Sequence, residues 1–233
     1  MTFFKRSLLL LSLCFISLQT FAQQVDWVNN GGGSSWDVGG DITSDDAGNS
    51  YAVGTSLANV TSFSRWGNDT LNTTNVNLGY QGFIVKHDIR GNRNWLISMG
   101  GTGTDLGTSI EMDSDTTFIV CGLYNSASPT FDTISGPSGS FAEVRMYLAR
   151  YDTSGGILWL ETARVGQSIV TPFNQLYWPK ISINDDGTIG VAGIFRGRAI
   201  FGSDTLTAAS TFDYDNYVAK YDNVNGTRRW VRS

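Results

Sequence analysis

The stretch NYVAKYD, residues 216–222, decides the fold, and Trp230 follows its terminal Asp222 by eight residues. The same phrase occurs earlier as MYLARYD, residues 146–152, and as GFIVKHD, residues 82–88. Each copy alternates between two kinds of side chain, which is the period of a β-strand, and each ends on an aspartate that suits a turn. The chain therefore contains the same strand-and-turn phrase three times.

Four tryptophans mark the same repeat at spacings of 68, 64 and 71 residues, namely Trp27, Trp95, Trp159 and Trp230. The first two units superimpose at a fixed offset of 68 residues, which places Gly54 over Gly122. Gly193 takes this position in the third unit. We interpret the tryptophans as large apolar plugs between units and the glycines as fixed structural positions.

Each unit predicts four short strands, which in the first unit involve residues 42–44, 50–53, 83–87 and the Trp95 segment. Each unit has a further repeated motif between its second and third strands: WGNDTL, TFDTI and FGSDTL. This motif indicates an elaborated loop or an extra hairpin. The predicted fold is all-β: a β-propeller-like array of three four-stranded antiparallel blades. The units span approximately 27–94, 95–158 and 159–230.

These phrases resemble a known family. GGTGTDLGTSIEMD, residues 100–113, and FGSDTLTAASTFDYDNYVAKYDNVNGTRRW, residues 201–230, are similar to the bacterial β-propeller repeats called SBBP repeats. The resemblance covers residues 27–230. It implies a propeller fold and an exported bacterial protein, and it implies no particular activity.

The number of blades does not match a closed ring. Propellers typically close with four to eight blades, whereas this chain has three strand cores and four Trp strands. We therefore expect an incomplete ring, most simply the front part of a longer protein with further blades. Alternatively, self-association into a larger ring would cover the two exposed end faces of the array. A β-solenoid is the lesser fold alternative.

The N-terminal residues predict export. Residues 1–22 combine Lys5 and Arg6 with an apolar core and end on Ala22, which is typical of a secretory signal peptide. The repeat region 23–233 would then be secreted or held at the cell surface. No second apolar run has membrane length, so membrane insertion is not expected. The formal charge of −5 is opposite to that of nucleic-acid-binding proteins, so nucleic acid is not an expected partner.

Candidate chemistry is sparse, and we predict no catalytic residue and no metal site. His87 is the only histidine of the chain and occupies the position of Tyr151 and Tyr221, which favours aromatic packing. Cys121 lies in an apolar strand, which favours a buried small side chain over a reactive thiol. No G-x-S-x-G motif is present.

Acidic residues cluster at equivalent turns, as Asp45 with Asp46, Asp113 with Asp115 and Asp185 with Asp186. Calcium would suit such oxygens, but their order does not match a calcium loop, and side-chain-capped turns explain them better. No cofactor is therefore expected. Lys86, Arg150 and Lys220 recur at one position, and we interpret them as a solvated row rather than an anion-binding ring.

A ligand site is most expected where the repeat is broken. Trp36 and Trp178 have no counterpart in the other units, and exposed aromatics there could stack on a sugar or a peptide. The competing interpretation, packing within loops, is favoured for both. The sequence thus indicates a non-catalytic binding or scaffold module with an unknown protein or glycan ligand. The alternatives are part of an enzyme acting on extracellular polysaccharide and a truncated fragment of a longer repeat protein.

Overall fold

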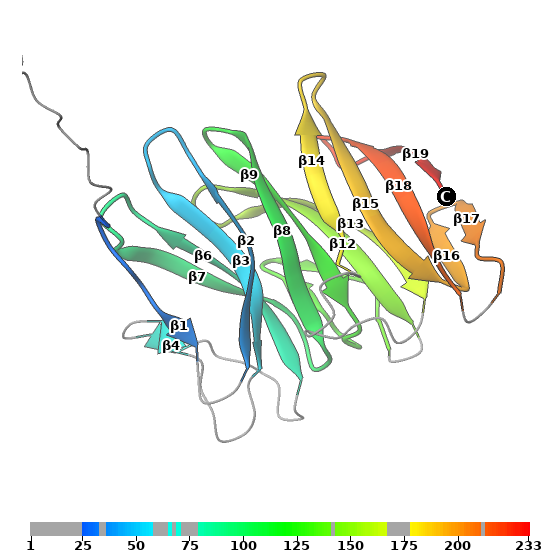
Figure 1. The fold of residues 1–233 in the computed structure, drawn as a ribbon, viewed down its shortest axis with the longest axis horizontal. Helices are drawn as coiled ribbons and strands as arrows, with labels where there is room; N and C mark the ends of the chain where they lie inside the picture. The colour runs from blue at the N-terminus through cyan, green and yellow to red at the C-terminus, as the bar shows by residue number, and fades with distance from the viewer. Residues whose placement is uncertain are drawn as a thin grey trace, which may run out of the picture.

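The computed structural model describes residues 25–32, 36–57, 65–66, 69–70, 79–140, 143–166, 178–210 and 213–233. The predicted signal peptide, residues 1–22, lies outside these ranges. Every regular element in the described ranges is a β-strand, and all the strand pairs are antiparallel (Figure 1). Over the same ranges there is accordingly no helix that could cross a membrane.

Three four-stranded cores follow one another along the chain, and we call them sheets 1, 2 and 3. Sheet 1 contains β2 (Asp37–Ser44), β3 (Ser50–Leu57), β6 (Tyr80–His87) and β7 (Arg93–Gly100). Sheet 2 contains β8 (Asp105–Ser114), β9 (Thr117–Tyr124), β12 (Val144–Asp152) and β13 (Ile157–Gly166). Sheet 3 contains β14 (Lys180–Asn184), β15 (Thr188–Arg196), β18 (Tyr214–Asp222) and β19 (Arg228–Arg232).

The prediction of exactly four strands per blade is wrong, because the sheets hold six, six and four strands. The repeated motif in the middle of each unit forms a hairpin. This hairpin pairs with an earlier segment of the chain rather than with the core strands that flank it. In the second unit β10 (Thr130–Phe131) and β11 (Ile134–Ser135) extend sheet 1 through β7. In the third unit β16 (Arg198–Phe201) and β17 (Asp204–Thr207) extend sheet 2 through β13.

The first unit obeys the same rule. Its hairpin, β4 (Arg65–Trp66) and β5 (Asp69–Thr70), pairs with β1 (Gly31–Gly32) in a small separate sheet. Gly31 and Gly32 lie four and five residues after Trp27. Met99 and Gly100, which pair with β10, lie at the same distances after Trp95. The physical reason for the extra strands is that the Trp strands β7 and β13 are the last of the four core strands, so their outer edges are open to pairing.

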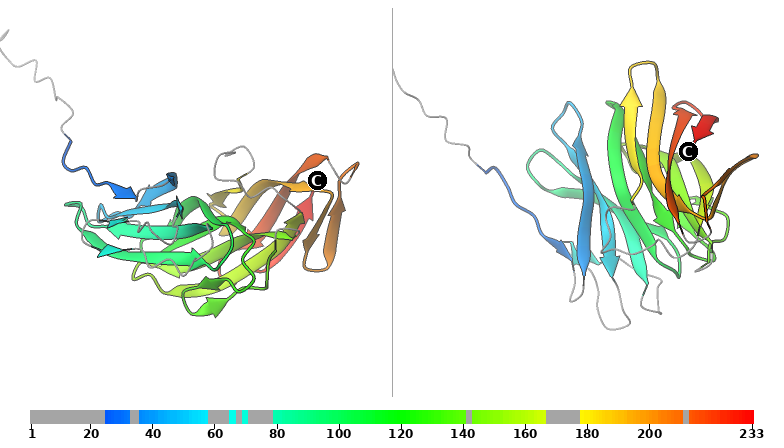
Figure 2. Two further views of the ribbon diagram at one scale, coloured as in Figure 1. Left: turned by 90° about the horizontal axis from the view of Figure 1, so that it is seen from below. Right: turned by 45° about the vertical axis from the view of Figure 1, so that its right-hand side comes forward.

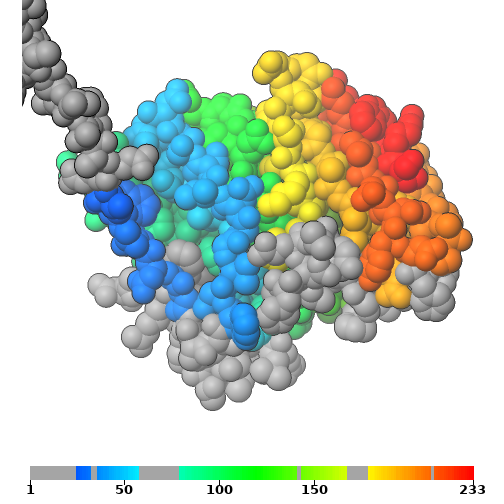
Figure 3. Space-filling view, viewed as in Figure 1, coloured from blue at the N-terminus to red at the C-terminus, as the bar shows by residue number. Residues whose placement is uncertain are grey.

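The three sheets pack side by side in chain order, so that β2, β8 and β14 are neighbours (Figure 1). Seen from below, the sheets form a crescent (Figure 2). In the space-filling view their colours follow one another across the molecule from the N-terminal to the C-terminal unit (Figure 3). We call the face that a sheet turns toward the preceding unit its N-side face, and the opposite face its C-side face.

Two apolar clusters fill the spaces between the sheets. Val53 and Ile84 on the C-side face of sheet 1 pack with Val120 and Tyr147 of sheet 2. Leu148 on the C-side face of sheet 2 lies in the same cluster as Val191 and Ala219 of sheet 3. Burial of these side chains between sheets is the dominant stabilising contribution to the array.

Candidate functional site: the inter-sheet faces and their Trp corners

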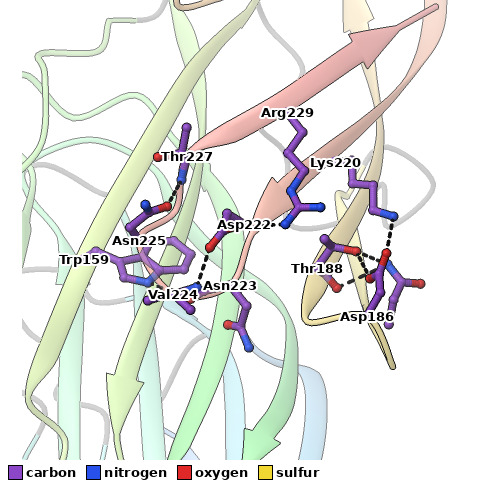
Figure 4. Close-up of polar contacts among 11 residues, drawn as sticks. Trp159, Asp186, Thr188, Lys220, Asp222, Asn223, Val224, Asn225, Thr227 and Arg229 are labelled. Carbon is purple, nitrogen blue, oxygen red and sulfur yellow. Dashed lines mark hydrogen bonds and ion pairs between the residues drawn. The ribbon is translucent and has the colours of Figure 1, made fainter.

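Trp27, Trp95 and Trp159 each contact the sheet that follows them in the chain. The indole Nε1–H of Trp95 donates to the Thr153 carbonyl oxygen at 3.2 Å, and that of Trp159 donates to the Asn223 carbonyl oxygen at 3.1 Å. Trp27 makes the same contact with the Ile89 carbonyl oxygen at 3.1 Å. In each case the acceptor directly follows the turn aspartate (Asp88, Asp152 or Asp222) of the sheet that comes next in the chain. We call each such contact a Trp corner; Figure 4 shows the one made by Trp159.

A glycine completes each corner. Gly91, Gly155 and Gly226 have φ values of 81°, 97° and 72°, in the left-handed region that disfavours a side chain. A Cβ atom added at Gly91 would lie 2.6 Å from the Trp27 ring, and one at Gly226 would lie 2.8 Å from the Trp159 ring. The indole therefore lies directly on the turn backbone, which requires glycine for both its conformation and its lack of a side chain.

The turn aspartates accept backbone hydrogen bonds, as the sequence predicts. Asp88 Oδ1 accepts from the amides of residues 90 and 92, and Asp152 Oδ1 accepts from those of residues 154 and 156. Asp222 Oδ1 accepts from the Val224 amide (Figure 4). Hydrogen bonding to Asn92 lowers the pKa of Asp88, and hydrogen bonding to Arg229 lowers that of Asp222. These carboxylates therefore stabilise the turns on which the indoles lie.

The row of cations is not the solvated row that we predicted. Lys86 Nζ donates to the Thr153 carbonyl oxygen of the next sheet at 3.0 Å, so this oxygen accepts from both Lys86 and Trp95. Arg150 forms an ion pair of 2.6 Å with Asp113, whose side chain is fully buried. Lys220 pairs with Asp186 at 2.9 Å. Each cation lies directly opposite a repeated Trp on the neighbouring strand, and each has an oxygen partner.

The repeated glycines lie beneath aromatic rings. Gly54, Gly122 and Gly193 are directly opposite Phe83, Tyr147 and Tyr217 on the neighbouring strand. At each glycine an added Cβ would lie 2.6 Å from the facing ring. These residues shape the N-side face of each sheet.

The innermost strands of neighbouring sheets are joined by side chains that accept backbone hydrogen bonds. Asp41 and Thr43 of β2 accept from the amides of residues 110 and 112 in β8. Ser109 and Glu111 of β8 accept from the amides of residues 181 and 183 in β14. Asp41 Oδ1 also accepts from its neighbour Ile42.

Lys180 occupies the position of Asp41 and Ser109 in sheet 3 and has no acceptor atom. It reaches back toward the preceding strands instead. Its Nζ donates to the Thr108 carbonyl oxygen at 2.6 Å and lies 3.5 Å from that of Gly40.

The strand register allows the faces of the three sheets to be compared row by row. On the N-side faces the central row is apolar in every sheet: Ile42, Ala52, Val85 and Leu96; Ile110, Val120, Ala149 and Leu160; Ile181, Val191, Ala219 and Val231. On the C-side faces the row changes: Asp41, Val53, Ile84 and Ile97; Ser109, Cys121, Leu148 and Glu161; Lys180, Ala192, Val218 and Arg232. The C-side face of sheet 3 is thus small and apolar in its centre and cationic at its ends.

The N-side face of sheet 1 contains a cavity of about 390 Å³, lined by Val38, Ile42, Ala52, Phe83 and the carboxylate-bearing Asp41, among others. In sheets 2 and 3 the corresponding face is covered by the preceding sheet. Ile42 is 64% exposed here, whereas its counterpart Ile110 is 3% exposed. The cavity therefore lies where a preceding sheet would pack.

The two candidate ligand-binding tryptophans lie in different surroundings. Trp36 precedes β2 and is 62% exposed. Trp178 is 5% exposed and belongs to the apolar cluster between sheets 2 and 3. Most of the inserted segment that precedes Trp178 falls outside the described residues.

His87 and Cys121 both lie in packed positions. His87 is 7% exposed and its ring lies 5.7 Å from that of Trp27; burial lowers its pKa. Cys121 is fully buried, which raises the pKa of its thiol to about 12. Both environments agree with the packing roles predicted from the sequence.

Two buried polar groups were missed by sequence reasoning. The first is the Asp113–Arg150 ion pair, to which Asn223 of the next unit donates at 2.8 Å. The second is Asp105, which accepts from Gly101 N and Ser126 Oγ while burial raises its pKa to about 6. A local sequence signal exists only for Asp105, which matches Asp37 of the first unit. Within the described ranges no group of three or more His, Cys, Asp or Glu side chains could hold a metal ion.

Comparison with known proteins gives one distant similarity. The chain is 24% identical over 148 residues to an uncharacterized WD repeat-containing protein of Acanthamoeba polyphaga mimivirus. The matched stretch is 60% of this chain and 10% of the viral protein, so the chain spans about a tenth of that relative. No family model matches the chain. Together with the all-β repeat architecture, this similarity supports a propeller-like repeat fold.

Proposed function

We propose that this protein is an exported, non-catalytic binding or scaffold module built from SBBP-type β-propeller repeats, acting outside the cell or at its surface. The observation that carries the proposal is the equivalence of the polar residues between units. The turn aspartates, the cations and the indoles of Trp27, Trp95 and Trp159 serve contacts within or between sheets. Side chains arranged for packing in every unit indicate a framework rather than a reaction centre.

Loops at the rim that carries Trp36 would provide the ligand contacts. Trp36 offers an exposed aromatic surface for stacking on a sugar ring or a peptide side chain. Trp178 would contribute to packing between sheets 2 and 3, where it is buried, rather than contact a ligand directly. The ligand is a protein or a glycan, and the module needs no cofactor.

Export is tested by expressing the full chain in a bacterium that secretes proteins. We expect the exported fraction to contain a species that begins at Gln23, as measured by mass spectrometry. A chain that keeps residues 1–22 and stays inside the cell would contradict the export proposal.

Binding is tested with labelled protein 23–233 on a glycan array and on immobilised extracellular matrix proteins of the same host. We expect binding on one of the two that Trp36→Ala weakens at least tenfold. Leu158→Ala, at another exposed apolar position, is the matched control and should leave binding unchanged. Release of reducing ends from a bound polysaccharide would instead favour the enzyme alternative.

A further inference from the structure

We propose that the Asp105 carboxyl group is a pH-sensitive switch: it holds the two loops between sheets 1 and 2 together when protonated and loosens them when ionised. This proposal goes beyond the binding role and does not depend on it. The outgoing loop, residues 101–104, leads from β7 into β8. The returning loop, residues 125–129, leads from β9 to the β10–β11 hairpin on sheet 1.

The first argument is that hydrogen bonds from both loops meet at Asp105. Its Oδ2 accepts from the Gly101 amide of the outgoing loop at 2.7 Å and from Ser126 Oγ of the returning loop at 2.5 Å. Ser126 Oγ itself accepts from the Gly103 amide at 2.8 Å. One carboxyl group therefore connects the two loops, directly and through the serine hydroxyl.

The second argument is that this junction also attaches the hairpin to sheet 1. Asn125 Oδ1 of the returning loop accepts from the Thr104 amide of the outgoing loop at 2.6 Å. Thr130, which begins β10, pairs with Gly100, which ends β7. A Cβ atom added at Gly100 would lie 2.2 Å from Asp105 Cγ, so the carboxyl group lies directly against this strand end. Loosening of the loops should therefore weaken the attachment of the hairpin to β7.

The third argument is that the surroundings of Asp105 do not stabilise a negative charge. The residue is 2% exposed, and its Oδ1 is buried without a hydrogen-bond partner. It forms no ion pair with any residue in the described ranges. Gly82 and Gly100, which adjoin it from sheet 1, have no side chain that could carry a charge. An ionised carboxylate here is costly because it is desolvated without a compensating cation.

The groups of sheet 2 near Asp105 give no compensation either. Its titratable neighbours are Tyr124, directly opposite on β9, and Tyr147 on β12. The charged groups that act on Tyr124 besides Asp105 are Arg145 and Glu143, and these two form an ion pair with each other. The only cation in this neighbourhood of the described chain is thus already neutralised by a carboxylate.

The direction of the pH effect follows from this environment. Burial raises the pKa of Asp105 from 3.8 to about 6 in the closed form. When the loops open, water reaches the carboxyl group and its pKa returns to the ordinary value. The open form therefore gains population as the pH rises through the closed-form pKa, and the ratio of open to closed loops should rise about tenfold between pH 5 and pH 8.

The test is hydrogen exchange of the Gly101, Gly103 and Thr104 amides in the chain 23–233 at pH 5 and pH 8. Protection is expressed relative to the intrinsic exchange rate at each pH. We expect protection of these three amides to be about tenfold lower at pH 8. We also expect them to exchange faster than the amides of β9 and β12 at both pH values, because the opening is local.

Two amides of the same molecule serve as the internal control. The amides of Arg90 and Asn92 donate to Asp88, a carboxylate whose pKa is lowered by hydrogen bonding and which is therefore ionised at both pH values. Their protection should be the same at pH 5 and pH 8.

Variants identify the titrating group. Asp105→Asn keeps an acceptor oxygen for the Gly101 amide but cannot ionise, so protection of the loop amides should no longer depend on pH. Asp37→Asn is the matched control, because Asp37 takes the same position in sheet 1 and accepts from Ser56 Oγ. It should leave the pH dependence unchanged. If Asp105→Asn fails to fold, carbon-13 spectra of the wild-type carboxyl group replace it: Asp105 should titrate over the pH range in which loop protection is lost.

Equal protection of the three loop amides at pH 5 and pH 8 would overturn the proposal. So would a pH dependence that persists in Asp105→Asn, or an Asp105 carboxyl group that titrates at its ordinary pKa. Loop amides that exchange no faster than those of β9 and β12 would also overturn it, because the opening would then involve the whole array.

Discussion

At the scale of single residues, the repeat glycines and the buried carboxylate of Asp105 carry the clearest energetic consequences. Gly122 is selected by the Leu106 carbonyl oxygen and the Tyr147 side chain, which would lie 1.8 Å and 2.6 Å from a Cβ atom at residue 122. Asp105 is held by two donors, and its Oδ1 has no described partner. Both positions therefore predict measurable changes in the free energy of unfolding.

Gly122→Ala should lower the free energy of unfolding by about 1–3 kcal/mol, because the added methyl group overlaps the Leu106 carbonyl oxygen and the Tyr147 ring in a closely packed core. Urea denaturation measures the change. Gly190→Ala is the matched control: its nearest neighbour would be the Ser182 carbonyl oxygen at 3.7 Å, so we expect a change within about 0.5 kcal/mol. Equal effects of the two substitutions would contradict the packing described for residue 122.

Asp105 should make stability depend on pH. Its folded-state pKa of about 6 lies above the ordinary value of 3.8, so the folded protein prefers the protonated carboxyl. The free energy of unfolding should therefore fall by about 1–1.5 kcal/mol as the pH rises from 5 to 8, through the folded pKa. The contribution is the difference between wild type and Asp105→Asn, measured by urea denaturation at both pH values. A difference that is the same at pH 5 and pH 8 would contradict a raised pKa.

At the scale of elements, the decisive contact is that between a Trp strand and the turn of the next unit. Trp159 donates to the Asn223 carbonyl oxygen and lies over Gly226, and Trp95 repeats the hydrogen bond on the second unit. The strand, the turn and the indole are thus one structural unit that spans two sheets. Stability of neighbouring sheets should consequently be coupled, as in other repeat proteins.

Trp159→Phe should cost about 0.5–1.5 kcal/mol, because the ring is kept while the hydrogen bond to Asn223 is lost. Trp230→Phe is the matched control in the monomer, since no described residue accepts from its indole, and it should change stability by less than about 0.5 kcal/mol. Thermal denaturation at low protein concentration compares the two. The assignment of the corner would be wrong if Trp230→Phe were the more destabilising of the pair.

Sequence reasoning found the elements but not all of their partners. The strand phrases, the turn aspartates and the Trp strands follow from local alternation and spacing, so they could be predicted. The pairing of Thr130–Phe131 with the sheet of the preceding unit could not, because both edges of a hairpin carry the same local signal. For the same reason Trp36 and Trp178 looked alike in sequence, although one is exposed and the other is buried by a distant sheet.

At the scale of the whole molecule, the array is asymmetric. Its N-side end is apolar and hollowed at Ile42, whereas its C-side end carries Lys180 and Arg232. The change from Asp41 through Ser109 to Lys180 along one row could have been read from the sequence only after the strand register was known. This asymmetry distinguishes a directional array from a symmetric stack.

The central claim, that each sheet is joined to the next by an indole on a turn backbone, is tested most directly by hydrogen exchange of the Trp Nε1–H groups in the chain 23–233. Nitrogen-15 spectra resolve these protons, and single Trp→Phe substitutions assign them. We predict slow exchange for Trp95 and Trp159 and fast exchange for Trp230. Exchange of Trp95 and Trp159 at the rate of the unfolded chain would contradict the account.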